Sequence, residues 1–315
     1  MLERITARLR DAYVNEITRT IETTPDHVAV IQDGNRRYAR EHGLDPADGH
    51  AHGADTTEDL LHWCNELDIS EVTLYTFSTE NFARPDDELA ELFELIREKL
   101  YSLADADLIH ENNVRINGLG DIQQLPADVI EAVEYAQQQT RAYDSLKLNI
   151  AIAYGGRNEL LRATRTIAEQ VQTEAIDPTE ITVATVESQL YQEPLQPVDL
   201  IIRTGGDKRT SNFLPWYANG NEASVYFCTS YWPSFSRVDF YRAMRTYAAR
   251  EQSWQETRTQ RATALLNALA RQDSKEYHTA VTRVREKLAG TGAAVVNKTR
   301  TDSTDSEASV SHADD

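Results

Sequence analysis

Short apolar runs alternate with longer amphipathic runs over the first 250 residues of the chain. The apolar runs have the length and composition of buried strands, and they lie at His27 to Gln32, Glu71 to Phe77, Val114 to Leu119, Leu146 to Ala153, Val198 to Arg203 and Ser224 to Cys228. The runs with helical spacing lie at Asn35 to His42, Thr56 to Leu67, Asp86 to Leu103, Ala127 to Ala142, Asn158 to Gln172 and Arg237 to Arg250. Strands that alternate with helices pair in parallel. The pattern therefore predicts an α/β fold with a central, mostly parallel sheet flanked by helices.

The two ends of the chain differ from this alternating part. Residues 1–24 have apolar positions at helical spacing, so we predict an N-terminal helical segment. Residues 253–289 are charged and helix-compatible, which indicates a C-terminal helical extension. Residues 290–315 are rich in Thr, Ser, Asp and Ala and have too little apolar surface to fold, so we predict an acidic disordered tail. Residues 25–252 remain as the main domain.

The charge of the chain restricts its partners. A net charge of −19 excludes a general nucleic-acid binder, because such a protein needs a basic face. Only six of the 32 basic residues are lysine. Many acids with few lysines are typical of a salty cytoplasm, where dense carboxylates keep a protein surface hydrated. We therefore predict a halophilic archaeal source, with an ordinary acidic protein as the alternative.

The length of the apolar runs and the number of cysteines indicate the cellular compartment of the protein. No apolar run approaches the roughly 20 residues of a membrane span. The first ten residues hold one acid and three arginines without an apolar stretch, unlike a signal peptide. Cys64 and Cys228 are too few for a disulfide framework and are predicted to be buried apolar residues. The sequence predicts a cytoplasmic protein that makes peripheral contact with the membrane surface.

A first polar cluster directly follows the strand that ends at Gln32 and precedes a helix; its residues are Asp33, Gly34, Asn35, Arg36 and Arg37. Ligands of open α/β sheets bind at the carboxyl ends of strands, where the positive end of a helix attracts an anion. One arginine guanidinium can donate two parallel hydrogen bonds to the oxygens of a phosphate. Asp33 adds a hard oxygen ligand that suits Mg²⁺ shared with a diphosphate. The alternative is a simple turn, since Asp-Gly-Asn is a favoured turn sequence.

Two further polar clusters follow later strands. The loop after Phe77 combines hydroxyl, amide, arginine and aromatic groups, or is simply a polar connection that ends at Pro85. The loop that begins at Arg203 has three cations, several hydroxyls and paired glycines, which suit an anion. This loop lacks the spacing of a nucleotide P-loop, and no GxGxxG follows the first strand, which disfavours an ATPase or a dinucleotide fold.

Five segments in order carry a resemblance to a known family: HVAVIQDGNRRYA, GHAHG, TLYTFSTENFARP, LNIAIAYGGRNEL and VDLIIRTGGDKRTSNFLPW, with YWP beyond them. From His27 to Arg250 the chain resembles the cis-prenyltransferases of the undecaprenyl diphosphate synthase type. The resemblance implies a catalytic domain over residues 25–252 that condenses isopentenyl diphosphate onto an allylic prenyl diphosphate. It implies a long-chain polyprenyl diphosphate such as undecaprenyl diphosphate as the product. It also implies a homodimer, with geranylgeranyl or farnesyl diphosphate as primer.

The resemblance assigns roles to single residues. Asp33 and Asn81 would be catalytic, and Asp33 would act with Mg²⁺, which Glu222 would help to hold. The allylic diphosphate would bind at Gly34, Asn35, Arg36, Arg37 and His50. A mobile loop between the two substrates would include Ser78, Thr79, Glu80, Phe82, Arg84 and Glu88. Isopentenyl diphosphate would bind at Arg203, Arg209 and Ser211. A hydrophobic tunnel would run between the helices near 56–67 and 86–103 and the sheet.

Four positions depart from the family pattern. Arg36 stands where the family usually has glycine, Pro46 where many members have arginine, and Lys208 where histidine is common. An acid is expected where this chain has Ser224, so the metal role of Glu222 requires an insertion before that strand. Two alternatives stay open: a non-catalytic or partner-dependent subunit of a heteromeric enzyme, and a short-chain cis-prenyl diphosphate synthase.

Overall fold

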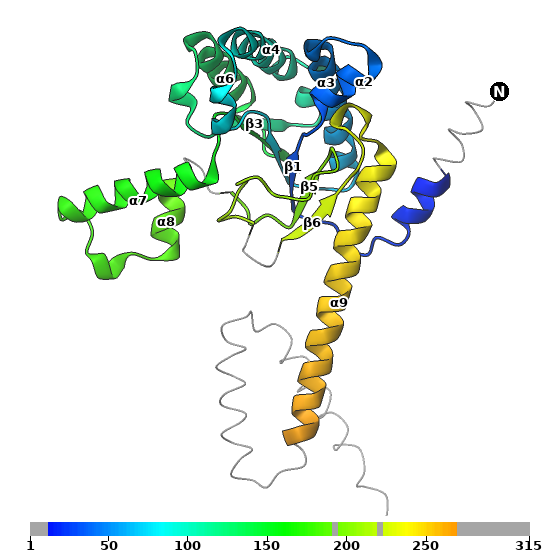
Figure 1. Ribbon diagram of the computed structural model, residues 1–315. Helices are drawn as coiled ribbons and strands as arrows, with labels where there is room; N and C mark the ends of the chain where they lie inside the picture. Colours follow the sequence, from blue (N-terminus) through cyan, green and yellow to red (C-terminus); the bar gives the residue numbers. More distant parts are fainter. Residues whose placement is uncertain (1–11, 191–194, 219–222, 270–315) are drawn as a thin grey trace, which may run out of the picture. The chain divides into compact units, whose positions relative to one another are not determined.

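The computed structural model describes residues 12–190, 195–218 and 223–269. Within these residues one sheet has the strand order β3-β4-β2-β1-β5-β6 (Figure 1). The strands are β1 His27–Ile31, β2 Glu71–Tyr75, β3 Val114–Leu119, β4 Leu146–Ala151, β5 Leu200–Arg203 and β6 Ser224–Phe227. Every pair of neighbouring strands is parallel, which confirms the predicted fold class.

The helices agree with the predicted alternation, with differences at their ends. They are α2 Asn35–His42, α3 Pro46–Glu66, α4 Asp86–Ala104, α5 Asp107–Glu111, α6 Ala127–Thr140, α7 Gly156–Gln172, α8 Val183–Leu190 and α9 Arg237–Leu269. Residues 12–18 are also helical, within the predicted N-terminal segment. The predicted start of α3 at Thr56 was wrong by ten residues, because Pro46 is at the first helical position, where its missing N–H costs nothing.

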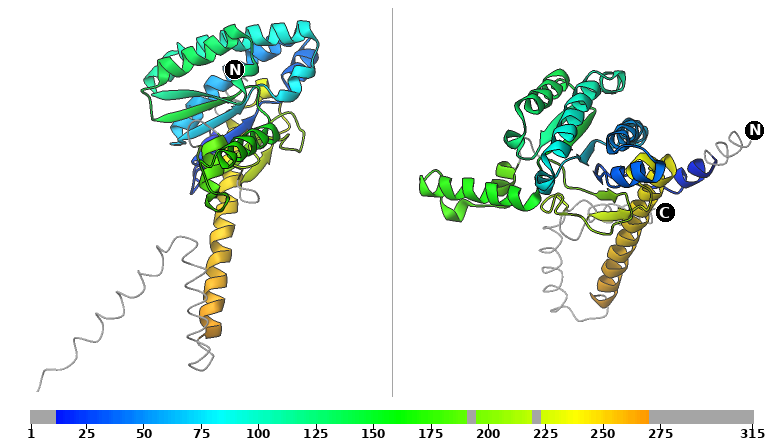
Figure 2. Two further views of the ribbon diagram at one scale, coloured as in Figure 1. Left: turned by 90° about the vertical axis from the view of Figure 1, so that its left-hand side faces the viewer. Right: turned by 45° about the horizontal axis from the view of Figure 1, so that its top comes forward.

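Two core clusters cover the two faces of the sheet, and the helices surround it in both views of Figure 2. All five residues of β1 are buried, and successive side chains point to opposite faces. Val28 and Val30 belong to the core that α3, α4, α6 and the start of α9 cover. Ala29 and Ile31 belong to the core beneath α7 and α8. Burial on both faces explains why the strands read as continuous apolar runs.

The register of the sheet brings the three polar clusters to one edge. Ile31, the last residue of β1, pairs with Tyr75 at the end of β2 and with Arg203 at the end of β5. Parallel strands end at the same edge, so the loops that follow them are neighbours. The clusters that follow Gln32, Phe77 and Ile202 therefore share one surface.

Helix α3 approaches this edge closely because of Gly53. A Cβ atom at Gly53 would lie 2.6 Å from Oδ1 of Asn35 and 2.8 Å from Cδ1 of Trp232. The indole Nε1 of Trp232 donates a hydrogen bond to the Gly53 carbonyl (2.6 Å). Only glycine fits between these groups, and the contact places α3 beside the loop that follows β6.

The chain divides by contacts into the units Met1–Glu251 and Gln252–Asp315. The division falls within α9, which continues through the residues where two separate helices were predicted. The predicted tail at 290–315 and the extension beyond residue 269 lie outside the described residues, as does the start of the N-terminal segment. The assignment of 25–252 as the catalytic domain stays a prediction. No described helix combines the length and the apolar character that a membrane span requires.

Candidate active site

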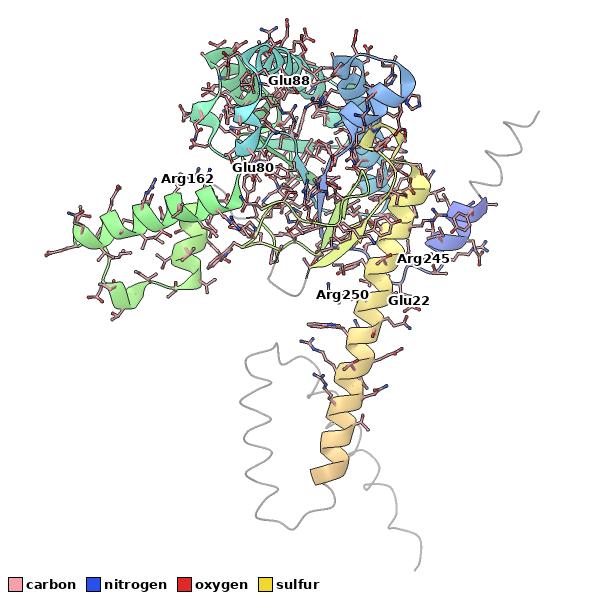
Figure 3. All side chains as sticks on the ribbon, in the orientation of Figure 1. Glu22, Glu80, Glu88, Arg162, Arg245 and Arg250 are labelled. Atoms are coloured by element: carbon pink, nitrogen blue, oxygen red, sulfur yellow. The ribbon has the colours of Figure 1, made fainter. Side chains whose placement is uncertain are left out.

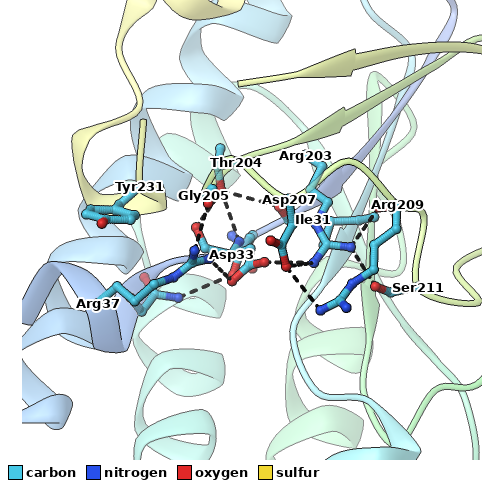
Figure 4. A network of polar contacts seen from close by, with 12 residues as sticks. Ile31, Asp33, Arg37, Arg203, Thr204, Gly205, Asp207, Arg209, Ser211 and Tyr231 are labelled. Carbon is cyan, nitrogen blue, oxygen red and sulfur yellow. Dashed lines mark hydrogen bonds and ion pairs between the residues drawn. The ribbon is translucent and has the colours of Figure 1, made fainter. Parts of the chain in front are cut away.

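Asp33 lies between arginines from two different elements (Figure 4). Arg37, on the first turn of α2, donates through Nη2 to Oδ1 of Asp33 (2.9 Å). Arg203, at the end of β5, donates through Nη2 to Oδ2 (2.8 Å). The side chain of Arg203 is 3% exposed and that of Asp33 is 27% exposed. The carboxylate therefore joins the two loops that were predicted to bind the two substrates, and one side of it stays open to solvent.

Arg203 organises the loop that follows β5. Its Nη1 donates to the carbonyl of Arg209 (2.7 Å) and to Oγ of Ser211, and its Nη2 also contacts Oδ2 of Asp207 (3.3 Å). Its buried Nε has no hydrogen-bond partner among the described residues. Arg209, whose side chain is 69% exposed, pairs with Asp207 (3.1 Å). Arg203 is thus built into the floor of the site, and Arg209 is placed to reach an incoming anion.

The same loop is held in an unusual backbone conformation. Ser211, Asn212 and Leu214 have φ values of 49°, 59° and 46°, which are rare for residues other than glycine. Asn212 fixes this conformation, because its carbonyl accepts from Gly156 N (3.0 Å) and its Oδ1 from Arg157 N (3.0 Å). Such a conformation persists only when its surroundings hold it, so the position of Ser211 is set before a ligand arrives.

Gly34, in the first polar cluster, is the N-cap residue of α2. Gly34 has φ 107°, and a Cβ atom there would lie 2.6 Å from a ring carbon of Tyr231. The Arg37 guanidinium lies over the same ring, 5.4 Å from its centroid, and Nη1 of Arg37 donates to the carbonyl of Gly205 (2.8 Å). Glycine at 34 therefore lets the aromatic ring brace both the backbone of the cluster and its second arginine.

A carboxylate bridges the two sides of the site entrance. Glu88 is labelled in Figure 3, and its Oε1 lies 2.9 Å from Nη1 of Arg36 and 2.9 Å from Nη1 of Arg84. His50 lies nearby on α3. Burial, reinforced by the charges of Arg84 and Arg36, lowers the pKa of His50 to about 4. At neutral pH His50 is therefore uncharged, and it can exchange hydrogen bonds with a phosphate without adding charge.

The loop after β2 uses two predicted residues to form its own turn. Ser78 and Asn81 form a reciprocal cap on the 3₁₀ helix η1 Thr79–Ala83, and Oδ1 of Asn81 accepts from Ser78 N (2.9 Å). Phe82 packs against Phe77, with ring centroids 5.0 Å apart. The side-chain oxygen of Asn81 thus helps to form the turn. The predicted catalytic role of Asn81 stays a prediction.

A cavity of about 330 Å³ runs from this cluster between α3, α4 and the sheet. Its charged and polar end includes Asp33, Asn35, His50, Ser78, Glu80, Asn81, Arg84, Arg203 and Ser211. Its body is lined mainly by apolar residues: Ala54, Leu74, Leu92, Leu95, Ile96, Leu100, Leu103, Ile150 and Ile152. The cavity lies where the tunnel was predicted.

A second depression adjoins the entrance of the cavity and supplies more cations. It is lined by four arginines, namely Arg36, Arg37, Arg40 and Arg84, together with Gly34, Asn35, His50 and Asp33. The predicted residues Thr79, Phe82 and Arg209 line neither hollow. In a chain with a net charge of −19, this concentration of arginine is a local exception that suits an anion.

The acid groups of the site fit a metal ion that arrives with its substrate. Among the described residues, no group of three or more His, Cys, Asp or Glu side chains is placed to hold a metal. Asp33 and Asp207 are the carboxylates that contact Arg203. Mg²⁺ is commonly bound by one or two protein carboxylates, with substrate phosphates as further ligands. The donor set therefore fits Mg²⁺ bound to a diphosphate and does not form an all-protein cage.

Glu222, the second predicted metal ligand, lies outside the described residues. Ser224 opens β6 and pairs with Leu200, so it lies at the amino end of the sheet, opposite the edge that carries Asp33. Its Oγ accepts from Nη1 of Arg250 (2.9 Å). The position of Ser224 therefore gives it no part in this site within one chain.

Three residues of the site were missed from the sequence: Thr204, Asp207 and Trp232. Asp207 lies among the cations of the third cluster, which drew attention to its basic residues alone. Trp232 is buried and also lines the cavity. Thr204 directly follows Arg203, and its position after a strand end was the available signal.

Comparison with known proteins agrees with this geometry. Residues 31–255 match the family model described as putative undecaprenyl diphosphate synthase. The chain is 56% identical over 266 residues to a Halobacterium salinarum protein named tritrans,polycis-undecaprenyl-diphosphate synthase (geranylgeranyl-diphosphate specific); the match covers 83% of this chain and 88% of the relative. A Haloarcula marismortui protein of the same name is 52% identical over 280 residues, covering 89% and 92%. The halophile-like composition agrees with these relatives.

The fold has a solved counterpart as well. Lavandulyl diphosphate synthase from Lavandula x intermedia, crystallised with dimethylallyl diphosphate, is 28% identical, with a TM-score of 0.65. The match covers 71% of this chain and 95% of that one. The family match spans both substrate loops, the cavity between them and the sheet beneath. The chain belongs to the undecaprenyl diphosphate synthase family of cis-prenyltransferases.

Proposed function

We propose that this protein extends geranylgeranyl diphosphate with isopentenyl diphosphate units in cis configuration and releases a long polyprenyl diphosphate. The observation that carries the proposal is the change of character along one cavity, from arginines and Asp33 at the entrance to leucines and isoleucines in the body. A diphosphate ester of a prenyl chain has the same two parts in the same order. Binding sites commonly combine apolar walls with a few placed polar groups in this way.

The two diphosphates would bind on the two sides of Asp33. The allylic diphosphate would lie in the depression at the start of α2, among Arg36, Arg37 and Arg84, where the helix N-terminus adds free N–H groups. Isopentenyl diphosphate would lie on the loop after β5, at Arg209 and Ser211. Arg203 and Arg37 both contact Asp33, so the two sites are mechanically connected through this residue.

The residue types suit the chemistry. Breaking the allylic carbon–oxygen bond leaves negative charge on the diphosphate, and the fixed arginines stabilise that charge as it develops. The double bond of isopentenyl diphosphate then attacks the allylic carbon, and a proton leaves the new unit. A bound Mg²⁺ ion would neutralise charge on the diphosphate oxygens, and Asp33 would hold it with Asp207 beside it. The apolar walls of the cavity keep water from the reacting carbon.

The chain also compensates for one departure from its family. Arg36 and Pro46 line the same depression, and Arg36 lies within reach of Glu88, next to Arg84. The arginine that many relatives carry at position 46 is thus replaced by a guanidinium from the neighbouring helix. We propose Arg36 as the substitute contact for the allylic diphosphate.

The primer assignment rests on the names of the relatives, which specify geranylgeranyl diphosphate. The oligomeric state is also a proposal: a homodimer is what the resemblance to the family implies. Contact with the membrane surface is proposed for the release of a product whose long apolar chain is poorly soluble in water.

The test is incorporation of labelled isopentenyl diphosphate by the purified chain with Mg²⁺, at low and high salt. Geranylgeranyl and farnesyl diphosphate serve as alternative primers, and Asp33→Asn serves as the inactive control. We expect long products that depend on geranylgeranyl diphosphate and are lost in the control. Products that stop after one or two additions would favour a short-chain synthase. A folded protein that binds diphosphate and incorporates nothing would favour a partner-dependent subunit.

A further inference from the structure

The backbone of Asp33 has an unusual environment. Asp33 follows β1, beyond the regular pairing of the sheet, and precedes Gly34 with its positive φ. Its N–H and C=O groups therefore have no partners in the sheet ladder, and they need other hydrogen-bond partners nearby. Both groups find a partner in the same side chain, the hydroxyl of Thr204, which is completely buried.

The hydroxyl of Thr204 contacts Asp33 in both directions. It accepts from Asp33 N (2.9 Å) and donates to the Asp33 carbonyl (2.7 Å); the Ile31 carbonyl, at 3.4 Å, is a weaker acceptor for the single proton. Asp33 also has two backbone partners, since its N donates to the Ile31 carbonyl (3.0 Å) and its carbonyl accepts from Trp232 N (3.0 Å). Within the described part of the chain, Thr204 is therefore the side chain that contacts both backbone groups of Asp33.

Thr204 acts together with the residue before it. Arg203 holds the carboxylate of Asp33, and Thr204 holds its backbone, so two consecutive residues of one loop fix both ends of the same acid (Figure 4). The loop that begins with them carries the proposed isopentenyl diphosphate site, whereas Asp33 leads into the allylic site on α2. The hydroxyl thus sets the position of Asp33 relative to both.

We propose that Thr204 is a positioning residue for Asp33 in the elongation reaction: its hydroxyl fixes the backbone from which the carboxylate reaches the diphosphates and their Mg²⁺. This inference rests on the proposed function. A small displacement of a reacting group is enough to reduce turnover, and partners that orient a metal-binding side chain typically change metal affinity or activity ten- to a hundredfold.

The chain offers a matched control at Thr140 on α6. Thr140 is also completely buried; its hydroxyl accepts from Ile116 N (2.9 Å) and donates to the Ala136 carbonyl (2.8 Å). Like the Thr204 hydroxyl, it accepts one backbone hydrogen bond and donates one, but it connects α6 to β3 and these bonds involve no residue of the site. Thr140→Val therefore has the structural cost of losing a buried hydroxyl without the proposed effect on Asp33.

The experiment compares Thr204→Val, Thr204→Ser and Thr140→Val in the full chain. We measure kcat, the KM of each substrate, the Mg²⁺ concentration for half-maximal rate and the melting temperature. Calorimetric binding of inorganic diphosphate with and without Mg²⁺ gives a readout that needs no turnover. We expect Thr204→Val to lose about ten- to a hundredfold in kcat and to need more Mg²⁺, both for turnover and for diphosphate binding. Thr204→Ser keeps the hydroxyl and should recover most of the activity.

Thr140→Val should lower the melting temperature and leave the kinetics and the Mg²⁺ requirement as in wild type. The proposal is overturned if folded Thr204→Val has wild-type kcat and Mg²⁺ requirement, or if Thr140→Val loses as much activity as Thr204→Val does. If Thr204→Val does not fold, Thr204→Cys makes the same test, because a thiol is a weak hydrogen-bonding group. Wild-type incorporation in the same assay separates a failure of this inference from a failure of the proposed function.

Discussion

The sheet carries two clusters of polar side chains, one at each end of its strands. The active-site cluster, at the carboxyl ends, contains Asp33, Arg37 and Arg203 with their neighbours. The buried ring, toward the amino ends, consists of the four side chains His27, Glu71, Thr73 and Asn149 and the backbone of Gln196. All four side chains of the buried ring have no exposed surface.

Hydrogen bonds close the buried ring on itself. Asn149 Nδ2 donates to Oε1 of Glu71 (2.7 Å) and to Oγ1 of Thr73 (3.2 Å), and the Thr73 hydroxyl contacts Nε2 of His27 (2.8 Å). His27 Nδ1 contacts the Gln196 carbonyl (2.8 Å), and Gln196 N donates to Oε2 of Glu71 (3.2 Å). The ring ties three strands to the residues that lead into β5. Such a fully satisfied network stabilises one arrangement of the fold.

The active-site cluster is open by comparison. Nε of Arg203 and Oδ1 of Asn35 are buried, and neither has a hydrogen-bond partner among the described residues. Six arginines surround this cluster, namely Arg36, Arg37, Arg40, Arg84, Arg203 and Arg209, against the four acids Asp33, Glu80, Glu88 and Asp207. The unmatched donor Nε of Arg203 and the surplus of positive charge indicate that this cluster is completed by an anion from outside. Within one sheet, the cluster whose hydrogen bonds are complete stabilises the fold, and the cluster whose hydrogen bonds are incomplete is left to bind a ligand.

The largest expected effect is on activity, from Asp33→Asn. The change keeps the shape of the side chain but removes the charge that both arginines contact and that Mg²⁺ requires. We expect the rate of isopentenyl incorporation to fall at least about 1000-fold, while the free energy of unfolding changes by only about 1 kcal/mol, because Arg203 keeps Asp207. Steady-state kinetics and urea unfolding measure the two quantities.

The matched control for this change is Asp128→Asn, at an exposed acid of α6 that pairs with Arg97 (3.1 Å). It should leave both quantities near wild type. A rate for Asp33→Asn within tenfold of wild type would remove Asp33 from the centre of the mechanism.

Glu71→Ala is expected to lower the stability of the protein and to leave its activity nearly unchanged. It opens the buried ring: Asn149 Nδ2 keeps only its longer hydrogen bond to Thr73, and Gln196 N loses its acceptor. The free energy of unfolding should fall by about 3 kcal/mol, whereas kcat per folded molecule stays within about twofold of wild type. Urea unfolding and active-site titration measure these, with Glu131→Ala on the exposed side of α6 as control. A loss of kcat in folded Glu71→Ala would show that the two clusters are coupled.

The sequence was sufficient for most of the fold because local pattern determined it. The strand predicted at Val114 to Leu119 is β3 to the residue, since apolar and polar residues alternate along most of it and Asn113 and Gly120 bound it. Helices α5 and α8 were missed because they span only five and eight residues and have little periodicity to detect. The helix predicted at Arg237 to Arg250 continues to Leu269 in α9, because the polar residues that follow contain no glycine or proline to end it.

The loops that form the active site could be predicted from the sequence, but the contacts between their side chains could not. Polar residues after strand ends identified the three loops, because parallel strands end together. The partners within the site could not be predicted, since they join residues far apart in sequence: Arg203 and Asp33 are 170 positions apart. The role of Glu88 as a bridge and that of Thr204 as a backbone contact depend on such tertiary pairs. The hydrogen bonds of the buried ring could not be predicted for the same reason, since they join His27, Glu71, Asn149 and Gln196.

The smallest expected effect concerns pH and the two histidines of these clusters. Burial lowers the pKa of His27 in the ring, and burial with nearby arginine charges lowers the pKa of His50 at the site to about 4. Between pH 6.5 and 4 the unfolded chain therefore binds more protons than the folded protein at His50. The free energy of unfolding must decrease as the pH falls through this range.

His50→Gln removes the contribution of His50 to this pH dependence and leaves that of His27 in the buried ring. We expect the decrease in the free energy of unfolding between pH 6.5 and pH 4.5 to be about 1 kcal/mol smaller in His50→Gln than in wild type. Urea unfolding at several pH values measures it. Equal decreases in both proteins would mean that His50 is protonated in the folded protein at no cost, so that neither its burial nor the neighbouring arginines disfavour the charged imidazole.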